Sequence, residues 1–312
     1  MDGWQLRQMQ SLPLEAKVIK SNLRIKEWYD HWEGEVCVSF SGGKDSTVLL
    51  HLVRQMYPDV PGVFVDTGLE YPEIRQFVKK VENVVWVKPD MHFKDVINKY
   101  GYPVISKRIA QYVRESRTRT GNNDATIRLR TTGIKPDGSL SKCSKIPDKW
   151  LFLREAPFAI SDKCCRVMKK APLDNYSKET GQMPFVGVMA ADGANRELSY
   201  LQTGCNAFGS KRPKSTPLGF WLEKDIWAYL DGHDVSYSEI YDKGYPRTGC
   251  MFCAFGAHLE PYPNRFQRMY YTHPKLYHYC IDKLGLGEVL DYCGVDYHPR
   301  GLQLELPSEE GD

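Results

Sequence analysis

The residues best suited to do chemistry form a short polar loop, Ser41-Gly42-Gly43-Lys44-Asp45-Ser46. The loop follows an apolar run typical of a strand, Val36 to Phe40, and precedes an apolar pattern with helical spacing. The two glycines let backbone amides approach an anion, and the new helix directs the positive end of its dipole at the same point. Lys44 adds a full positive charge. This layout predicts a binding site for a phosphate group.

The spacing of the glycines excludes an ordinary P-loop NTPase. That class requires a glycine five positions before Gly43, where this chain has Val38. A simple glycine-rich surface turn is the alternative, and the strand before the loop and the helix after it argue against that interpretation.

Length and composition limit the remaining possibilities. The 312 residues suffice for one large α/β domain, or for a domain of about 200 residues with an appendage. No run of about 18 apolar residues exists and the N-terminus lacks a hydrophobic signal core, which predicts a cytoplasmic protein with no membrane segment. In a reducing compartment, nine cysteines favour metal, cluster or thiol chemistry over disulfides.

Strands and helices alternate along much of the chain. We predict strands at 36–40, 60–65, 83–87 and 185–189, and helices at 14–33, 46–57, 71–82, 92–100 and 223–230. This alternation is typical of a doubly wound parallel sheet, whose ligand lies at the carboxyl ends of the strands. Polar groups follow three of these strands: the glycine loop, Asp66 to Gly68, and Asp192 to Arg196.

A basic insertion interrupts the alternation at about 107–154, where twelve basic residues accompany four acidic ones. Its arginines at 114, 117, 119, 128 and 130 lie among polar residues, and we expect no packed layer here. Both a solvated helix with a loop and a footprint for a phosphate backbone remain open. We predict an N-terminal helix at 1–34, a nucleotide-binding domain at 35–260 that contains the insertion, and a helical C-terminal extension with a mobile acidic tail at 261–312.

Two cysteine pairs have the spacing of a metal or cluster site: Cys164-Cys165, and Cys250 with Cys253 in a CxxC. Unrelated buried thiols have no reason to occur in such pairs. Because the side chains of adjacent residues diverge, one zinc ion is harder for them to bind than the separate corners of a [4Fe–4S] cluster. We therefore favour the cluster and keep structural zinc as the alternative.

Five ordered motifs between Val36 and Cys253 resemble one family. They are the loop from Ser41 to Ser46, Asp66-Thr67-Gly68 with Tyr71-Pro72-Glu73, Cys164 to Leu173, Thr216 to Leu230, and Gly244 to Cys253. The first resembles the PP-loop of ATP pyrophosphatases, and the whole set is similar to the phosphoadenosine phosphosulfate (PAPS) and adenylylsulfate reductase-like family, which includes the DNA-phosphorothioation enzymes. Leu222 replaces that family's usual hydroxyl cap. The resemblance implies an adenine nucleotide α-hydrolase-like fold.

One departure from the reductases guides the choice of function. Their Glu-Cys-Gly-Leu-His motif is missing, and only Cys293 lies near the C-terminus. We therefore expect an ATP pyrophosphatase that adenylates an acceptor, nucleic acid above all, so that sulfur can be inserted. A sulfonucleotide reductase that releases sulfite is the first alternative, and a non-catalytic nucleotide-binding partner in a sulfur-transfer complex is the second.

The resemblance assigns roles to individual residues. We expect the PP-loop to hold the pyrophosphate of ATP, or an adenylyl sulfate, with Mg²⁺, while Asp66 contacts ribose or Mg²⁺ and Arg196 contacts phosphate. The expected catalytic residues are Lys44, Asp45, Asp66 and Arg196. The expected nucleotide contacts are Ser39, Ser41, Gly42, Gly43, Lys44, Asp45, Ser46, Asp66, Thr67, Gly68 and Asp192. The expected partners are a nucleic acid on the insertion and a sulfur donor such as a cysteine desulfurase. Cys143, Cys205 and Cys293 remain open as reactive thiols.

Overall fold

A computed structural model describes residues 1–300 of the chain. The chain divides into two compact units. The first unit comprises Met1–Phe93 and Cys165–Cys250, and the second comprises Lys94–Cys164 and the chain from Met251 onward. The basic insertion and the C-terminal helices thus belong to the same unit, a division that differs from the predicted boundaries at 34/35 and 260/261. The predicted acidic tail at 301–312 lies outside the described residues.

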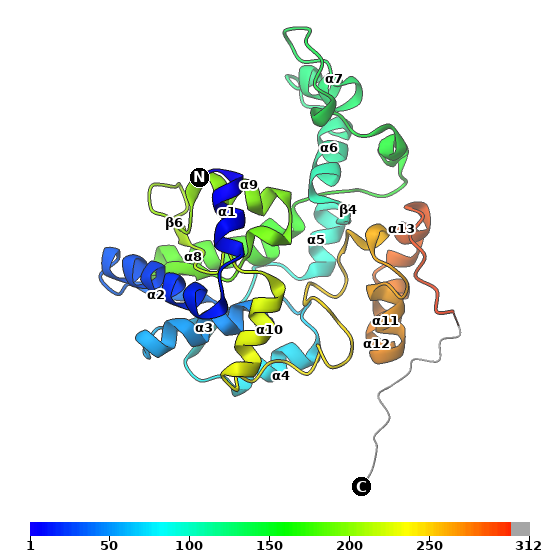
Figure 1. Ribbon diagram of the computed structural model, residues 1–312. Helices are drawn as coiled ribbons and strands as arrows, with labels where there is room; N and C mark the ends of the chain where they lie inside the picture. The colour runs from blue at the N-terminus through cyan, green and yellow to red at the C-terminus, as the bar shows by residue number, and fades with distance from the viewer. Residues whose placement is uncertain (301–312) are drawn as a thin grey trace. The chain divides into compact units, whose positions relative to one another are not determined.

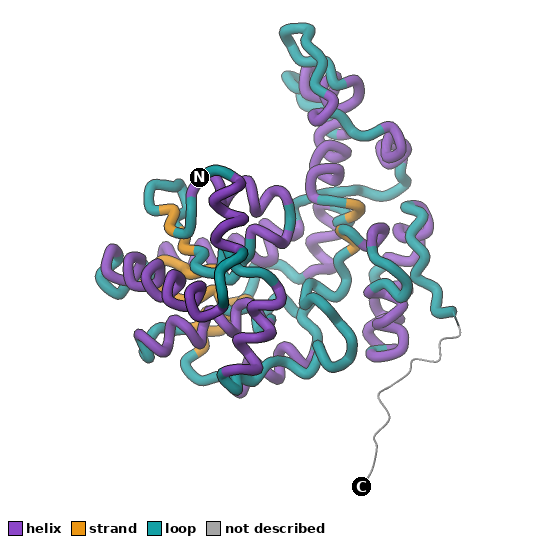
Figure 2. The backbone as a smooth tube through the Cα atoms, in the orientation of Figure 1, coloured by secondary structure: helices purple, strands orange, loops and turns teal. Residues whose placement is uncertain are grey.

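The first unit is built on a six-stranded sheet with the order β3-β2-β1-β5-β7-β6. The strands are β1 (Val36–Ser39), β2 (Gly62–Val65), β3 (Val84–Val87), β5 (Met183–Val186), β6 (Asn206–Ala207) and β7 (Lys214–Ser215). All neighbouring pairs are parallel except β6 with β7, which is antiparallel. Figure 2 shows these strands between helices, so the predicted α/β fold is confirmed, with one antiparallel strand at the edge.

Strand β1 lies in the middle of the sheet, and its sequence explains why. Val36, Cys37 and Val38 are all fully buried, as expected for a parallel strand that is covered on both faces. Val38 pairs with Gly62 of β2 on one side and with Phe185 of β5 on the other. The glycine loop therefore leaves the sheet at its centre.

Strand β5 ends at Val186, earlier than the predicted limit of residue 189. The reason lies in the next residue. A Cβ at Gly187 would meet the Cα of Ser46 at 3.0 Å and the carbonyl carbon of Asp45 at 3.1 Å. The chain must turn here to pass the start of helix α3, and the N–H of Val188 bonds back to the carbonyl of Val186 at 3.0 Å.

Helices cover the sheet in the first unit (Figure 1). Helix α3 (Lys44–Met56) packs against β1 and β5, and α2 (Leu14–His31) and α10 (Glu223–Gly232) pack against α3. Helix α8 (Ala171–Thr180) packs against β2 and β3. The remaining helices of this unit are α1 (Gly3–Gln10), α4 (Pro72–Lys80) and α9 (Ala194–Thr203).

A buried ion pair fastens α2 to α10. The Nζ of Lys17 lies 2.5 Å from Oδ2 of Asp225, and Lys17 is fully buried. The same carboxylate oxygen accepts a hydrogen bond of 2.7 Å from the N–H of Leu222, which precedes α10. Asp225, the third residue of α10, thus satisfies the backbone amide of the residue that caps the helix, as the third helical residue does in a capping box.

The second unit is mainly helical. Its parallel strands β4 (Val104–Ile105) and β8 (Ala254–Phe255) pair with each other. Its helices are α5 (Phe93–Tyr100), α6 (Lys107–Arg117), α7 (Asp124–Thr132), α11 (Arg265–Thr272), α12 (Pro274–His278) and α13 (Leu286–Tyr292). The chain breaks between α11, which ends at Thr272, and α12, which begins at Pro274.

The basic insertion packs more tightly than we expected from its composition. Ile109, Ala110 and Val113 on α6 are buried, as are Ile146 and Leu153 farther along the chain. The expectation of an unpacked insertion is therefore wrong for α6. Its apolar positions follow a helical spacing that the dense arginines obscured.

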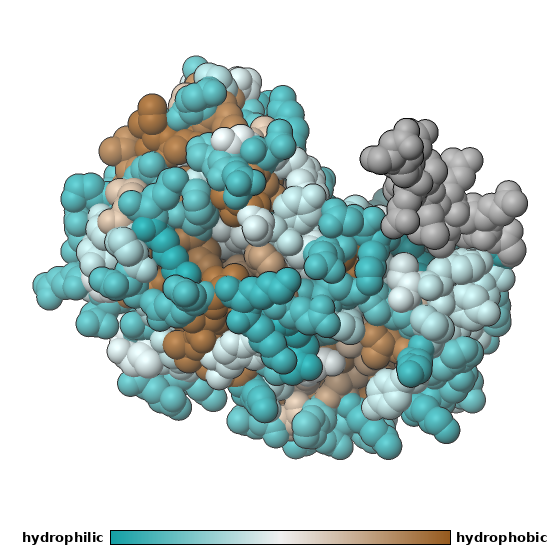
Figure 3. Space-filling view, turned by 90° about the horizontal axis from the view of Figure 1, so that it is seen from below, coloured by the Kyte–Doolittle hydropathy of each residue, from teal (hydrophilic) through white to brown (hydrophobic). Residues whose placement is uncertain are grey.

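Most of the visible surface is polar. Figure 3 shows one face of the protein, on which hydrophilic side chains predominate and hydrophobic residues gather in patches. Among the described residues, no helix is long and apolar enough to cross a membrane.

Candidate functional site

The glycine loop has a shape that only glycine permits at its centre. Gly42 has a φ of +71°, and a Cβ there would lie 2.7 Å from Val78 and 2.9 Å from Ile74. A Cβ at Gly43 would lie 2.6 Å from the hydroxyl of Thr248. The two glycines therefore let the backbone turn sharply against α4 and keep the start of α3 accessible.

The hydroxyls of the loop stabilise its own conformation. Ser46 Oγ donates a 2.9 Å hydrogen bond to the carbonyl of Gly43 and accepts one of 3.2 Å from the N–H of Ser41. The hydroxyls of Ser41 and Ser46 lie 3.1 Å apart. Ser46 is only 4 % exposed, so its first role in this structure is to hold the loop.

A polar cavity of about 350 Å³ lies beside the loop in the first unit. It opens where β1 and β5 end, which is the point of the sheet at which the strand order reverses and where ligands of such folds bind. Its lining includes eight residues that the sequence predicted: Ser39, Ser41, Gly43, Lys44, Asp45, Ser46, Asp192 and Arg196. It also includes Lys169, Glu223, Tyr241, Arg247 and Thr248.

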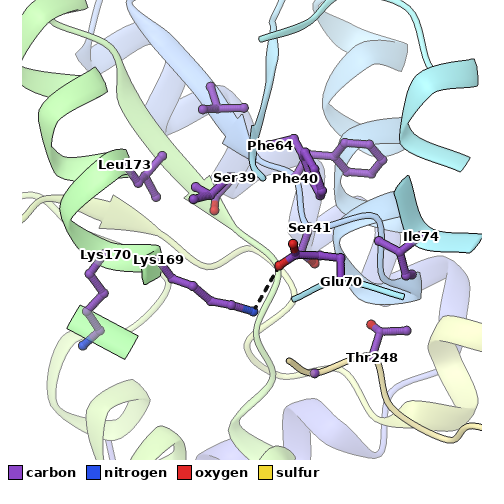
Figure 4. Close-up of a pocket in the computed structure, with 13 residues that line it drawn as sticks. Ser39, Phe40, Ser41, Phe64, Glu70, Ile74, Lys169, Lys170, Leu173 and Thr248 are labelled. Atoms are coloured by element: carbon purple, nitrogen blue, oxygen red, sulfur yellow. Dashed lines mark ion pairs between the residues drawn. The ribbon is translucent and has the colours of Figure 1, made fainter. Parts of the chain in front are cut away.

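An apolar cavity of about 210 Å³ adjoins the polar one, and both are lined by Ser39, Ser41, Lys169 and Thr248. Its other walls are mostly apolar and include Phe40, Val63, Phe64, Val65, Ile74 and Leu173. Figure 4 shows the side chains of Glu70 and Lys169 pointing toward each other there. The two cavities together suit a ligand with a flat apolar part and an anionic tail.

Lys44 is the best-fixed cation of the polar cavity. It is 5 % exposed, and its Nζ lies 3.3 Å from Oδ1 of Asp45 and 3.4 Å from Oε1 of Glu223. Burial lowers the pKa of Lys44, but the charges of Asp45, Tyr241 and Glu223 together outweigh burial and raise it. Lys44 therefore carries its positive charge at neutral pH.

Asp45 is ion-paired with Lys44, whose Nζ lies 3.3 Å from its Oδ1. Its Oδ1 is buried and accepts no hydrogen bond from any described residue. Burial raises the pKa of Asp45, the Lys44 charge opposes this effect, and the charges of Asp192 and Glu223 add to it. Mg²⁺ is commonly held by one or two carboxylates together with phosphate oxygens of the substrate, so Asp45 fits a Mg²⁺-nucleotide. Within residues 1–300, no group of three or more His, Cys, Asp or Glu residues is arranged to hold a metal ion.

The residues that directly follow β2, Asp66 to Gly68, lie outside both cavities. Asp66 Oδ2 accepts a 2.8 Å hydrogen bond from Arg75, and Thr67 Oγ1 donates one of 2.8 Å to Glu70. Neither these residues nor Gly68 line either cavity, although Glu70 lines the apolar one. By contrast, Asp192 and Arg196 form an ion pair with each other, and both line the polar cavity.

A tyrosine occupies part of the predicted phosphate cradle. The backbone N–H of Lys44 donates a 2.8 Å hydrogen bond to the hydroxyl of Tyr241, which also lies 3.3 Å from the hydroxyl of Thr248. Tyr241, Thr248 and Arg247 were missed as site residues. Arg247 and Thr248 lie in the motif that precedes Cys250, where a cation beside glycine and proline was the available signal.

The four cysteines of the predicted cluster are divided between the units. Cys165 and Cys250 belong to the first, and Cys164 and Cys253 belong to the second. Within the first unit, the charge of Cys250 and its hydrogen bond with Lys169 raise the pKa of Lys169. The charge of Cys165 raises it further. Burial raises the pKa of Cys250, while Lys169 opposes it. Lys169 thus offsets part of the burial that disfavours the Cys250 thiolate, the form that cluster iron requires, and the complete four-cysteine site remains a prediction.

Three other thiols differ in accessibility. Cys293 is 6 % exposed, and burial raises its pKa to about 12. Cys205 is buried beside the hydroxyl of Tyr200 at 3.2 Å, and burial raises its pKa. Cys143 is exposed, and hydrogen bonds with Ser141 and Ser144 lower its pKa. Cys293 is therefore unsuited to act as a nucleophile in this conformation.

Residues 35–116 and 145–255 match the family model described as the phosphoadenosine phosphosulfate reductase domain. The chain belongs to this family. An adenosine 5'-phosphosulfate reductase of Anoxybacillus flavithermus is 26 % identical over 264 residues, which cover 83 % of this chain and 89 % of that protein. The matched segments leave residues 117–144 of the basic insertion outside the family domain.

Two solved structures resemble the chain at low sequence identity. The PAPS reductase of Candida auris in a phosphate complex is 15 % identical, covers 80 % of this chain and 96 % of its own, and has a TM-score of 0.42. The U34-tRNA thiolase of Methanococcus maripaludis with its [4Fe–4S] cluster is 14 % identical, covers 89 % and 80 %, and has a TM-score of 0.37.

Proposed function

We propose that this protein is an ATP pyrophosphatase that adenylates an oxygen atom of an acceptor so that sulfur can replace it. The observation that carries the proposal is the charge pattern of the polar cavity. Lys44 lies there in an ion pair with the buried Oδ1 of Asp45, and Asp192 and Glu223 line the same cavity. Lys44, Lys169, Arg196 and Arg247 in this lining attract phosphates, and the three carboxylates can share in holding the Mg²⁺ that accompanies a triphosphate.

The apolar cavity suits the adenine ring of the same nucleotide. Phe40, Phe64 and Ile74 provide apolar contacts, and the cavity joins the polar one at Ser39, Ser41, Lys169 and Thr248. An adenine in this position would direct its phosphates toward the loop. Asp66 lies outside both cavities, so we assign it the role of supporting Arg75 rather than contacting the nucleotide in this conformation.

In the proposed reaction, an acceptor oxygen attacks the α-phosphorus of ATP and the bond to the bridging oxygen of the pyrophosphate breaks. Negative charge grows on the leaving pyrophosphate, where Lys44, Arg196 and the loop amides stabilise it more strongly than in the ground state. Mg²⁺, when bound, neutralises part of the same charge. The hydroxyl of Tyr241 must leave the Lys44 amide before that amide can contact phosphate.

Sulfur insertion would follow adenylation. The outer sulfur of a persulfide, from a donor such as a cysteine desulfurase, replaces the adenylated oxygen, and AMP leaves with that oxygen. A thiol reductant then supplies two electrons that break the S–S bond to the donor, so that the inserted sulfur stays on the acceptor. Cys164, Cys165, Cys250 and Cys253 would hold a [4Fe–4S] cluster, which, when present, supplies iron sites for sulfur or links the two cysteine segments. Lys169 would stabilise the thiolate of Cys250.

Sulfonucleotide reduction is the second candidate, and family membership favours it. That reaction requires a thiolate that attacks the sulfate and forms a thiosulfonate. The C-terminal candidate, Cys293, is buried with its pKa raised to about 12, so this conformation offers no thiolate there.

Release of pyrophosphate and AMP from ATP tests the proposal. The protein is purified anaerobically and assayed with and without DNA or tRNA, and sulfite release from adenylyl sulfates is measured in parallel. We expect pyrophosphate release that Lys44→Ala lowers by about 10²- to 10³-fold, the range observed for losing one group that stabilises transition-state charge. Lys224→Ala is the matched control, because Lys224 is exposed next to Glu223 and lies outside the cavity lining.

Three results would count against adenylation. Sulfite release without pyrophosphate would establish the reductase instead. Nucleotide binding without turnover of either substrate would indicate a non-catalytic partner. Equal rates for Lys44→Ala and the unmodified protein would remove the PP-loop from the chemistry.

A further inference from the structure

We propose that exposed cations of the basic insertion bind the phosphate backbone of a nucleic acid. We call them the basic surface, and its members are Lys107, Arg108, Arg119, Arg128 and Lys142. Helices α6 and α7, which carry most of them, are labelled in Figure 1. The inference rests on the proposed function in one respect, because it names the class of acceptor that the adenylating site would serve.

The first step separates these cations from arginines that hold the insertion together. Arg114 Nε lies 3.0 Å from Asp162, and Arg130 Nε lies 2.7 Å from Glu115. Arg117 donates hydrogen bonds of 2.7 Å and 2.9 Å to the carbonyls of Phe158 and Ala156. These three arginines are engaged within the second unit and cannot leave their partners without a cost in stability.

The basic surface differs from these arginines in having no such partners. Its five side chains are exposed, and none forms an ion pair with another residue of the described chain. Two of the insertion's four acids are already paired with cations: Glu115 with Arg130, and Asp148 with Lys145. The surplus of positive charge therefore faces solvent.

The surface is too long for a single phosphate. Lys107 and Arg117 are the ends of α6, and eleven residues of helix span about 16 Å. Arg119 lies beyond the far end of the helix, whereas Arg108 lies at its start. A nucleic acid carries a phosphate about every 3.4 Å along each strand, so its backbone can reach cations at both ends.

Local hydrogen bonds fix how the insertion presents these cations. The side chain of Asn123 accepts a 2.9 Å hydrogen bond from the N–H of Thr120 and donates one of 2.6 Å to the carbonyl of Thr118. These two bonds shape the turn that carries Arg119. The hydroxyl of Tyr112 donates a 3.3 Å hydrogen bond to the carbonyl of Cys143, the residue next to Lys142. Such fixed cations bind with less loss of conformational freedom than cations on a mobile loop.

The family comparison supports a separate role for this surface. Arg119, Arg128 and Lys142 all lie within 117–144, the segment that the reductase domain leaves unmatched. These cations are therefore an addition to the domain that carries the nucleotide cavity, as expected for a feature that serves a particular acceptor.

Fluorescence anisotropy with labelled single-stranded DNA, duplex DNA and tRNA tests the proposal on the full chain without ATP. Arg119→Ala/Arg128→Ala removes two cations without breaking an ion pair. Because each phosphate contact contributes about 0.7 to 0.9 to the slope of log affinity against log salt, we expect the slope to shrink by about 1.4 to 1.8. We also expect affinity at low salt to fall about tenfold or more.

Lys79→Ala/Lys80→Ala is the matched control, because both lysines are exposed on α4 in the first unit and the net charge changes equally. An equal loss in both double variants would overturn the proposal, since net charge alone would then explain it. Unchanged affinity and slope for Arg119→Ala/Arg128→Ala would overturn it as well. So would binding to anionic phospholipid vesicles with no binding to any of the three nucleic acids.

A parallel assay distinguishes this inference from the proposed function. Pyrophosphate release from ATP without nucleic acid, in which water attacks the α-phosphorus in place of the acceptor, should be the same for Arg119→Ala/Arg128→Ala and the unmodified protein. If binding fails while release continues, only the nucleic-acid surface is wrong. If binding is confirmed and release is missing under all conditions, only the adenylation proposal is wrong.

Discussion

The cations of the polar cavity and those of the basic surface work under opposite conditions. Lys44 is 5 % exposed, and two carboxylates lie within 3.4 Å of its Nζ. Arg119 and Arg128 are exposed and form no ion pair with any described residue. A buried, compensated cation is fixed where charge develops in a reaction, whereas an exposed cation remains free to attract a polyanion. Under the two proposals, the first region serves the chemistry and the second captures the nucleic acid.

The largest expected effect concerns Lys17, a buried cation that lies outside both regions. It tests how much a buried ion pair contributes to stability. Lys17→Ala leaves the carboxylate of Asp225 buried between α2 and α10 with its ion-pair partner gone. We expect a loss of about 3 to 5 kcal/mol in the free energy of unfolding, measured by urea denaturation. Lys26→Ala is the control on the same helix, because its ion pair with Asp30 is exposed and contributes little to stability. Equal losses in the two variants would contradict the distinction between buried and exposed cations.

Arg130 is less buried than Lys44 but, unlike Arg119 and Arg128, it forms an ion pair. Its substitution tests whether the paired arginines stabilise the insertion. Arg130→Ala removes the contact with Glu115, the hydrogen bond to the carbonyl of Ser144 and the stacking on Tyr112 at 3.8 Å. We expect the free energy of unfolding to fall by about 1.5 to 3 kcal/mol, as for a hydrogen bond to a charged group.

The same variant should affect nucleic-acid binding differently. The salt dependence measured by anisotropy for Arg130→Ala should match that of the unmodified protein, because its guanidinium is already paired with Glu115. A slope that shrinks as much as in Arg119→Ala/Arg128→Ala would show that ion pairing does not decide which arginines contact phosphate.

The smallest predicted effect concerns Tyr241. Its hydroxyl accepts a hydrogen bond from the Lys44 amide, so a bound phosphate must displace it. Because one neutral hydrogen bond is worth about 0.5 to 1.5 kcal/mol, Tyr241→Phe should bind pyrophosphate about 2- to 10-fold more tightly in calorimetry. Tyr237→Phe is the control, since the Tyr237 hydroxyl contacts Asp242 at 3.2 Å instead. Weaker binding by Tyr241→Phe would show that the hydroxyl itself contacts the ligand.

The PP-loop was predictable because its signals are local. Strand, glycines, lysine and helix lie within one short stretch, and Gly42 adopts the positive φ that the loop requires. Tyr241 and Thr248 reach the same loop from about 200 residues away, and a hydroxyl carries no spacing pattern that reveals its partner. The sequence therefore predicted the loop residues that line the cavity and missed Tyr241 and Thr248, which line it from a distant part of the chain.

The arginines of the insertion show that sequence also does not reveal which charged side chains are paired in the fold. Sequence composition treats Arg114, Arg119 and Arg130 alike. Arg114 pairs with Asp162, which is 48 positions away, and Arg130 pairs with Glu115, whereas Arg119 has no such partner among the described residues. Only the folded chain separates structural arginines from those that are free to bind.

Transfer of label from the α-phosphate of ATP to an acceptor nucleic acid tests the central claim most directly. The assay contains Mg²⁺ and no sulfur donor, so that the adenylated acceptor accumulates. We predict that label migrates with the nucleic acid and that pyrophosphate appears in equal amount. Lys44→Ala should lower both rates by about 10²- to 10³-fold, whereas Lys224→Ala should change neither. Sulfite production from an adenylyl sulfate, with no label transferred and no pyrophosphate released, would contradict the account.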